Sequence, residues 1–206
     1  YGYAAAEPFS MIDASMYARV SDTDFRKKMW VAPAGTALEG QTTFIDAKFA
    51  AQYFIPYVSV KFRPNEGDTQ EFSVGSASAY PIMRVEEMYF IEAECEARLE
   101  GKADLLTAFM TQYRDADYVC KASSPEDILD EVIFQKRVEL WGEGHVFFDY
   151  KRLNMPVVRG YASPLLTNHQ DASRFNTTTR PAWMSVSIVI TEENNKLKIK
   201  NSDNSN

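Results

Sequence analysis

The sequence has no excess of basic charge, few cysteines and histidines, and no long apolar run. Its 206 residues carry 22 lysines and arginines against 29 acidic residues, a formal net charge of −7. Proteins that bind nucleic acids need a basic surface for the phosphates, so the composition argues against that class. A helix that crosses a bilayer needs about 20 consecutive apolar residues, and no segment meets this requirement.

Two cysteines, Cys95 and Cys120, and two histidines, His145 and His169, are too few for a disulfide framework or a zinc site. The helices predicted below would hold the two cysteine Cα atoms roughly 15–20 Å apart. A disulfide requires less than about 7 Å. We therefore expect two free thiols, no metal and no cofactor.

Motifs for common catalytic sites are also missing. The chain contains no Gly-x-Ser-x-Gly, no Walker loop and no Gly-x-Gly-x-x-Gly. A carboxylate pair that hydrolyses glycosides can come from any part of a chain, so a glycoside hydrolase stays a less favoured alternative. We expect a protein that is not an enzyme and has no catalytic residues.

Helical periodicity begins after Pro81. A first helix is predicted from residue 84 to a C-capping Gly101, and a second follows after a very short turn, which makes the two antiparallel. Ser124 and Pro125 then predict the start of a third helix over 125–142. The apolar residues that mark these helices are Val85, Met88, Tyr89, Ile91, Cys95 and Leu99 in the first, Leu105, Leu106, Phe109, Met110, Tyr113 and Ala116 in the second, and Ile128, Leu129, Val132, Ile133, Leu140 and Trp141 in the third.

The remaining segments show weaker patterns. Residues 1–80 are rich in loops, with short helical patterns over 11–19 and 22–30 and extended chain over 41–63. A short helix is predicted over 145–153 and a short strand over 186–190. The polar tail after residue 192 is expected to fray.

Two groups of charged residues have alternative interpretations. Asp22 and Asp24 could bind a metal, but capping of the following helix explains them better. A larger set could supply acid and base groups, or could form an ion-pair network that ties the third helix to the next element. We favour the network for this set, which comprises Arg137, Glu139, Glu143, His145, Asp149, Lys151 and Arg152.

Aromatic residues make up 13% of the chain, and several lie outside the helical stripes. Rings on loops can stack on sugars or can cover a core, and for any single ring the second role is the commoner one. The rings in question are Tyr1, Tyr3, Trp30, Tyr53, Tyr57, Tyr161 and Trp183.

The segment Arg84-Val85-Glu86-Glu87-Met88-Tyr89-Phe90-Ile91-Glu92-Ala93-Glu94 resembles a helix of the SusD/RagB family, with Gly101 and Ala103 at the expected places after it. The Asp24-Phe25-Arg26 stretch resembles a second family block. A third runs from Arg137 to Arg152 and contains Glu139, Leu140, Glu143, Gly144, Asp149 and Lys151. The blocks occur in family order along most of the chain.

This resemblance implies a mostly α fold, with tetratricopeptide-like helix pairs, long irregular loops and little β structure. It also implies an outer-membrane lipoprotein at the cell surface, which takes part in nutrient uptake. Such a protein binds oligosaccharides without catalysis and delivers them to a SusC-like TonB-dependent channel.

Because family members are much longer, we expect this chain to be the C-terminal portion of a SusD-like domain. Residues 1–80 would be loop-rich, 81–153 the helical scaffold and 154–206 the irregular C-terminal segment. The candidate ligand-binding residues are Tyr1, Tyr3 and Trp30. The main alternative function is a helical-repeat module that binds another protein.

Overall fold

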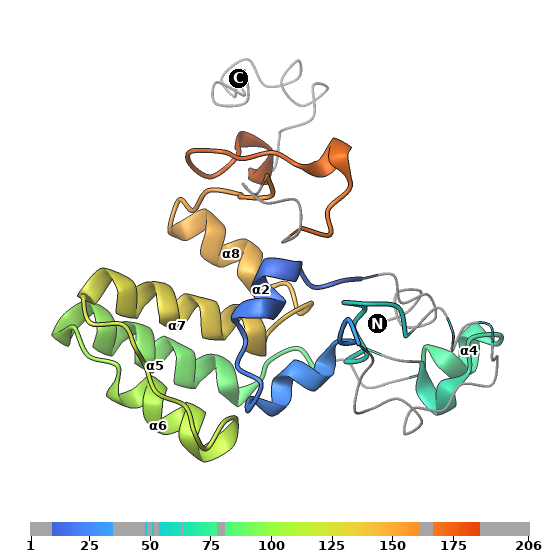
Figure 1. Cartoon of the computed structure of the whole chain (residues 1–206), viewed down its shortest axis with the longest axis horizontal. Helices are drawn as coiled ribbons and strands as arrows, with labels where there is room; N and C mark the ends of the chain where they lie inside the picture. Colours follow the sequence, from blue (N-terminus) through green and yellow to red (C-terminus); the bar gives the residue numbers. More distant parts are fainter. Residues whose placement is uncertain are drawn as a thin grey trace, which may run out of the picture. The chain divides into compact units, whose positions relative to one another are not determined.

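Figure 1 shows a computed structural model of the chain, which describes residues 10–34, 48, 51, 54–62, 64–77, 81–160 and 167–185. The chain forms two compact units, Tyr1–Glu139 and Leu140–Asn206, and each is considered by itself. Within the described residues the regular structure is helical, and β pairing is limited to three isolated bridges. The expectation of a mostly α fold is therefore confirmed.

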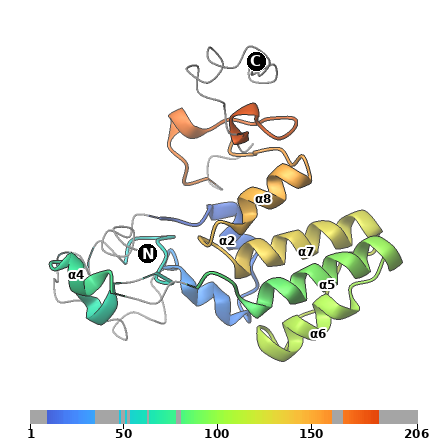
Figure 2. The ribbon, with the colours of Figure 1, turned by 180° about the vertical axis from the view of Figure 1, so that it is seen from behind.

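Helices α5 (Val85–Glu100) and α6 (Asp104–Tyr113) form an antiparallel pair in the first unit, as Figures 1 and 2 show. Gly101 ends α5 in the left-handed conformation, with φ of 64°. A Cβ atom at this position would also lie only 3.3 Å from Pro125 Cγ, which makes glycine the fitting residue. The predicted tight turn is thus confirmed at its capping residue.

Helix α7 (Pro125–Glu139) packs along α5. Its first turn is capped by Ser124, whose Oγ accepts a hydrogen bond from the backbone N–H of Asp127 at 3.1 Å, as the sequence predicted. The helix ends three residues before the predicted position 142. The chain turns there, and Gly142 and Gly144 take positive φ values of 77° and 88°.

The main core lies between these three helices. It consists of Phe90, Ala93 and Ala97 from α5, Leu106, Phe109 and Met110 from α6, and Ile128 and Val132 from α7. Most of the apolar residues whose spacing predicted the first helix lie on the side of α5 that faces away from this core. Val85 and Leu99, for example, are 65% and 84% exposed. In α6, Leu105 and Tyr113, whose apolar spacing marked the second predicted helix, are likewise exposed.

The chain before residue 62 packs by backbone pairing rather than by regular strands. Helix α2 (Ala14–Arg19) and the 3₁₀ turn η1 (Phe25–Met29) are separated by short extended segments. The segment at 57–60 exchanges backbone hydrogen bonds with residues 10–12 on one side and 29–31 on the other. Val31, Val58 and Val60 form a second, smaller core here. The extended chain expected over 41–63 is therefore observed only around residues 58–60, since residues 48 and 51 are helical and residues 54–57 form turns.

The described part of the first unit also contains two shorter elements, η2 (Asn65–Gly67) and α4 (Phe72–Gly75). In the second unit, α8 (His145–Arg152) confirms the predicted short helix. It is followed by η4 (Asp171–Ser173), η5 (Ala182–Met184) and an antiparallel bridge between Val158 and Asn176. The predicted strand at 186–190 and the tail lie outside the described residues.

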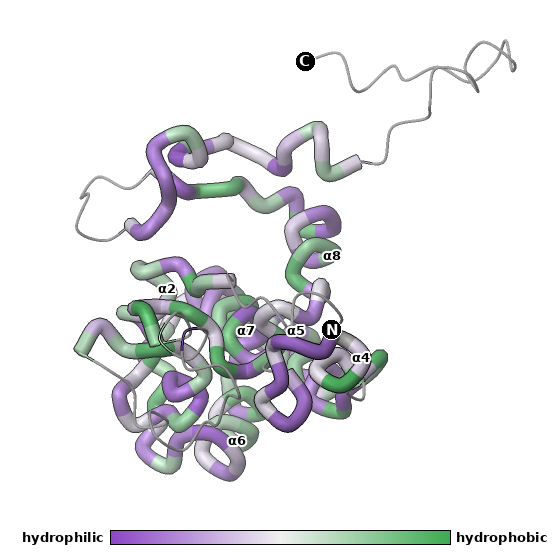
Figure 3. Tube along the Cα trace, turned by 90° about the vertical axis from the view of Figure 1, so that its right-hand side faces the viewer, coloured by the Kyte–Doolittle hydropathy of each residue, from purple (hydrophilic) through white to green (hydrophobic). Residues whose placement is uncertain are grey.

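Hydrophobic and hydrophilic residues alternate in short stretches along the described chain (Figure 3). No helix in this part of the chain is both long enough and apolar enough to span a membrane.

A pair of leucines tests the assignment of the core. Leu106 has no exposed surface, whereas Leu99 is 84% exposed. We expect Leu106→Ala to lower the free energy of unfolding by about 2–5 kcal/mol, because it removes buried methyl groups and leaves a cavity. Leu99→Ala should change it by less than about 0.5 kcal/mol. Urea unfolding of both variants measures the difference, and equal losses would contradict this core.

Candidate functional site

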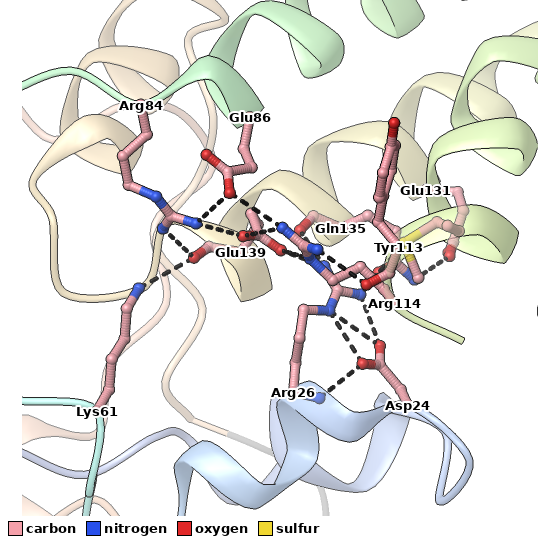
Figure 4. Close-up of polar contacts among 11 residues, drawn as sticks. Asp24, Arg26, Lys61, Arg84, Glu86, Tyr113, Arg114, Glu131, Gln135 and Glu139 are labelled. Carbon is pink, nitrogen blue, oxygen red and sulfur yellow. Dashed lines mark hydrogen bonds and ion pairs between the residues drawn. The ribbon is translucent and has the colours of Figure 1, made fainter. Parts of the chain in front are cut away.

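A dense group of polar contacts surrounds the carboxylate of Glu139, at the C-terminal end of α7 (Figure 4). Three guanidinium groups contact it: Arg26 Nη1 at 3.2 Å, Arg84 Nη2 at 2.6 Å and Arg114 Nε at 2.7 Å. The Glu139 side chain is buried, with 4% of its surface exposed. We call Glu139, these three arginines and the partners described below the Glu139 cluster.

Arg26 is the most buried of the three arginines and uses its whole guanidinium group. Asp24, which caps η1, accepts hydrogen bonds from the Arg26 backbone N–H at 2.9 Å and from Nη2 at 2.6 Å. Arg26 Nη2 also donates to Oε1 of Gln135. Asp24 therefore has two roles. It caps η1, and its carboxylate neutralises Arg26, which lies two residues later in the chain.

Arg84 and Arg114 share a second carboxylate, Glu86, at 3.0 and 3.1 Å. Arg84 precedes α5 and Arg114 follows α6, so the cluster joins the open ends of the helix pair. Lys61 Nζ donates to the backbone carbonyl of Glu139 at 3.0 Å. The cluster thus connects η1, the 57–62 segment, α5, α6 and α7.

The arginines keep Glu139 ionised. Burial alone would raise the pKa of its carboxyl group, but the hydrogen bonds and positive charge of Arg114, with those of Arg26 and Arg84, lower the pKa to about 2. For Glu86, burial likewise opposes ionisation, and the hydrogen bond from Arg84 lowers its pKa. Carboxylates held in this way are poor general acids or bases at neutral pH, so the cluster is built to anchor the fold.

Glu131 forms a neighbouring anchor in the middle of α7. Its carboxylate accepts from Arg19 at 2.5 Å, from the Tyr118 hydroxyl at 3.1 Å and from the amide of Gln135 at 2.7 Å. The Arg19 guanidinium also lies 3.8 Å from the centre of the Phe134 ring, a cation–π contact. These contacts attach α2 to α7.

The structure changes the composition of the predicted charge network. Of that set, Glu139 belongs to the cluster described above, whereas Asp149 pairs with Arg152 within α8 at 2.8 Å. The sequence had placed Asp24 and Arg26 in one block and Arg84 in another, and the structure brings both blocks to Glu139. Arg114 and Gln135 were not anticipated, since nothing local distinguishes them from other polar helix residues.

The expected capping role of the Asp22–Asp24 segment is confirmed. Asp24 caps η1, and Asp22 accepts a hydrogen bond from Lys27 Nζ at 2.6 Å. The described residues contain no group of three or more histidine, cysteine or acidic side chains that could hold a metal ion. Cys95 and Cys120 are free thiols, as expected.

The candidate ligand-binding residues take different positions. Trp30 is completely buried, with 0% of its surface exposed, so it presents no ring face to a ligand in this structure. Sequence alone could not distinguish a displayed ring from a buried one. Tyr1 and Tyr3 lie outside the described residues.

Other aromatic rings are accessible on each unit. In the first unit, Phe25 is 51% exposed and Tyr113 is also exposed, beside Tyr89 with 6.0 Å between ring centres. In the second unit, Trp183 is 62% exposed. Tyr57 is half-buried and makes an edge contact with Tyr17, with 5.5 Å between ring centres. These rings, rather than Trp30, are available for stacking.

Removal of the central carboxylate should be costly. Glu139→Ala would leave three arginines in a buried site without their shared counter-charge, and we expect a loss of about 3–5 kcal/mol in the free energy of unfolding. The matched control is Glu100→Ala, which removes an exposed carboxylate paired with Lys102. The control should change stability by less than about 1 kcal/mol. Chemical denaturation would contradict the anchoring role if the two variants were equally stable.

The low pKa of Glu139 also predicts a pH dependence. The group has a pKa of about 2 in the folded protein against 4.5 as the ordinary value. Its contribution to stability is therefore complete above pH 4.5 and is lost as the pH falls through the folded pKa, a change on the order of 3 kcal/mol. In Glu139→Gln this part of the pH dependence should vanish. Denaturation curves of both proteins between pH 6 and about 2.5 measure it, and parallel curves would contradict the assignment.

Comparison with known proteins adds three findings. A sequence model of the SusD family matches residues 22–202. The fold is similar to that of a SusD-like carbohydrate-binding protein from Bacteroides vulgatus, with a TM-score of 0.55 and 25% identity over 89% of this chain. The match spans 40% of the length of that solved chain. A search of the curated proteins finds no match. Since the family match covers most of the sequence, the chain belongs to the SusD family.

Proposed function

We propose that this chain is part of a cell-surface protein that binds oligosaccharides and delivers them, without chemical change, to a TonB-dependent outer-membrane channel. The observation that carries the proposal is the SusD family match over residues 22–202. The similar fold of a SusD-like carbohydrate-binding protein supports it. Attachment to the outer membrane through a lipid and a SusC-like partner are parts of the same proposal, and both rest on the family resemblance.

The Glu139 cluster supports a role without catalysis. Its two glutamates are engaged by arginines, and the arginines lower the pKa of both carboxyl groups. Glycoside hydrolysis needs one carboxyl group with a raised pKa that can donate a proton. The cluster therefore serves as a scaffold that holds the connecting segments in place.

Exposed rings supply the binding chemistry. An aromatic face covers the apolar C–H groups of a sugar ring and contributes most where it is accessible. Trp183 and Phe25 are two of the described rings that a ligand can reach, because more than half of the surface of each is exposed, as it is for Phe148. Tyr1 and Tyr3 remain candidates, whereas Trp30 acts through packing.

Affinity electrophoresis against a panel of polysaccharides tests the proposal. We expect at least one polysaccharide to retard the chain, and Trp183→Ala or Phe25→Ala to weaken that binding about 10-fold, equivalent to about 1.4 kcal/mol. The matched controls are Val158→Ala and Val119→Ala, which shorten exposed apolar side chains that lack a ring. Their binding should stay unchanged.

Two outcomes would contradict this function. One is unretarded migration on every polysaccharide, which would show that the chain lacks a glycan site. The other is accumulation of reducing ends during prolonged incubation with a bound polysaccharide, which would favour the glycoside hydrolase.

A further inference from the structure

The second unit has the opposite charge balance to the rest of the chain. Residues 140–206 carry eight lysines and arginines against six acidic residues, whereas residues 1–139 carry 14 against 23. A local excess of positive charge attracts anions and raises their concentration near the surface. Within this acidic chain, the second unit is therefore the part that favours a negatively charged ligand.

An aromatic ring and a cation lie side by side on this unit. The antiparallel bridge between Val158 and Asn176 makes Arg159 and Phe175 the next cross-strand pair. Side chains directly opposite each other point to the same face of a ribbon. The Arg159 guanidinium carbon lies 5.2 Å from the centre of the Phe175 ring, a cation–π contact. Phe175 is 36% exposed and Arg159 is half-buried, so a ligand can reach both.

Hydrogen bonds of the paired backbone hold these two residues in place. The backbone N–H of Arg159 donates to the carbonyl of Phe175 at 2.9 Å. The Asn176 side chain reinforces the pairing, because its Oδ1 accepts from the N–H groups of Arg159 and Gly160 at 3.1 and 2.8 Å. Its Nδ2 donates to the Gly160 carbonyl at 3.0 Å. A site that is ordered in this way before it binds loses less conformational entropy on binding.

Arg159 forms no ion pair with a carboxylate of the described residues. Two other arginines of the unit do: Arg152 pairs with Asp149 at 2.8 Å, and Arg174 pairs with Asp171 at 2.7 Å. Stacking on an aromatic ring uses the flat face of a guanidinium group and leaves the N–H groups at its edge able to bind a carboxylate in a bidentate manner. The Arg159 side chain can therefore offer charged donors to an anionic ligand.

We propose that Arg159 and Phe175 form a subsite for an acidic sugar, such as a uronic acid, within the glycan that this chain binds. The Phe175 ring packs against the C–H groups of the sugar, and the Arg159 guanidinium binds its carboxylate. The inference rests on the proposed function and specifies its substrate class, which is oligosaccharides that carry carboxylates.

Pairs of polysaccharides that share a backbone and differ in charge test this inference. Polygalacturonate and its methyl ester form one pair, and alginate and its propylene glycol ester form another. Affinity electrophoresis of the full chain measures the dissociation constant for each polysaccharide. We expect an acidic polysaccharide to bind about 10-fold more tightly than its ester, because the ester cannot accept charge-assisted hydrogen bonds from a guanidinium group.

Variants assign the two contacts. Arg159→Gln should abolish the preference for the acidic polysaccharide, whereas Arg174→Gln, which removes a guanidinium group already held by Asp171, should leave the preference unchanged. Phe175→Ala should weaken binding of the acid and of its ester by the same factor, about 10-fold, because the ring contacts C–H groups that both possess. Polyglutamate, which carries carboxylates without sugar rings, should not compete. Circular dichroism of each variant checks that it is folded.

Three outcomes would overturn the proposal. One is equal binding of acid and ester in every pair, and another is loss of the preference in Arg174→Gln as well as in Arg159→Gln. The third is competition by polyglutamate, which would show that the unit binds any polyanion. Binding of polysaccharides without a charge preference overturns this inference and leaves the proposed function intact. Absence of binding to every polysaccharide contradicts the proposed function and this inference together.

Discussion

The carboxylate of Glu139, held by three arginines, is the interaction on which the first unit depends. Charged groups leave water only when they are paired, and removing one member of such a cluster leaves the others in a buried site without compensation. Glu139 receives Arg26, Arg84 and Arg114 from three separate places in the chain. The ends of α5, α6 and α7 and the η1 turn must therefore meet at one point, which specifies how these elements assemble.

The helices combine this polar anchor with an apolar core. Packing of side chains such as Leu106 and Val132 supplies most of the stabilisation, but apolar contacts tolerate small shifts of one helix along another. The Glu139 cluster at the ends of the helices tolerates such shifts less well, because its hydrogen bonds require particular distances. A rigid scaffold of this kind suits a protein whose binding residues lie on the connecting segments.

Burial decided which aromatic and apolar residues are available for binding. Trp30 is in a core, while Phe25, five residues earlier, and Trp183 in the other unit are exposed. Similarly, α5 buries its alanine-rich face and exposes Val85 and Leu99. Small residues such as Ala93 and Ala97 allow the neighbouring helices to approach closely, so the less hydrophobic face became the inner one.

Local chemistry made much of the fold predictable. The Ser124 cap, the left-handed Gly101 and the apolar periodicity act within a few residues, so sequence alone located the helices to within a few positions. The sequence also carried the family blocks that contain Arg26, Arg84 and Glu139. Arg26, Arg84 and Arg114 lie 113, 55 and 25 residues from Glu139 in the sequence. Only the tertiary structure showed that these residues meet. Contacts over such separations depend on how helices pack, and the same packing decided which face of α5 was covered and whether Trp30 could reach a ligand.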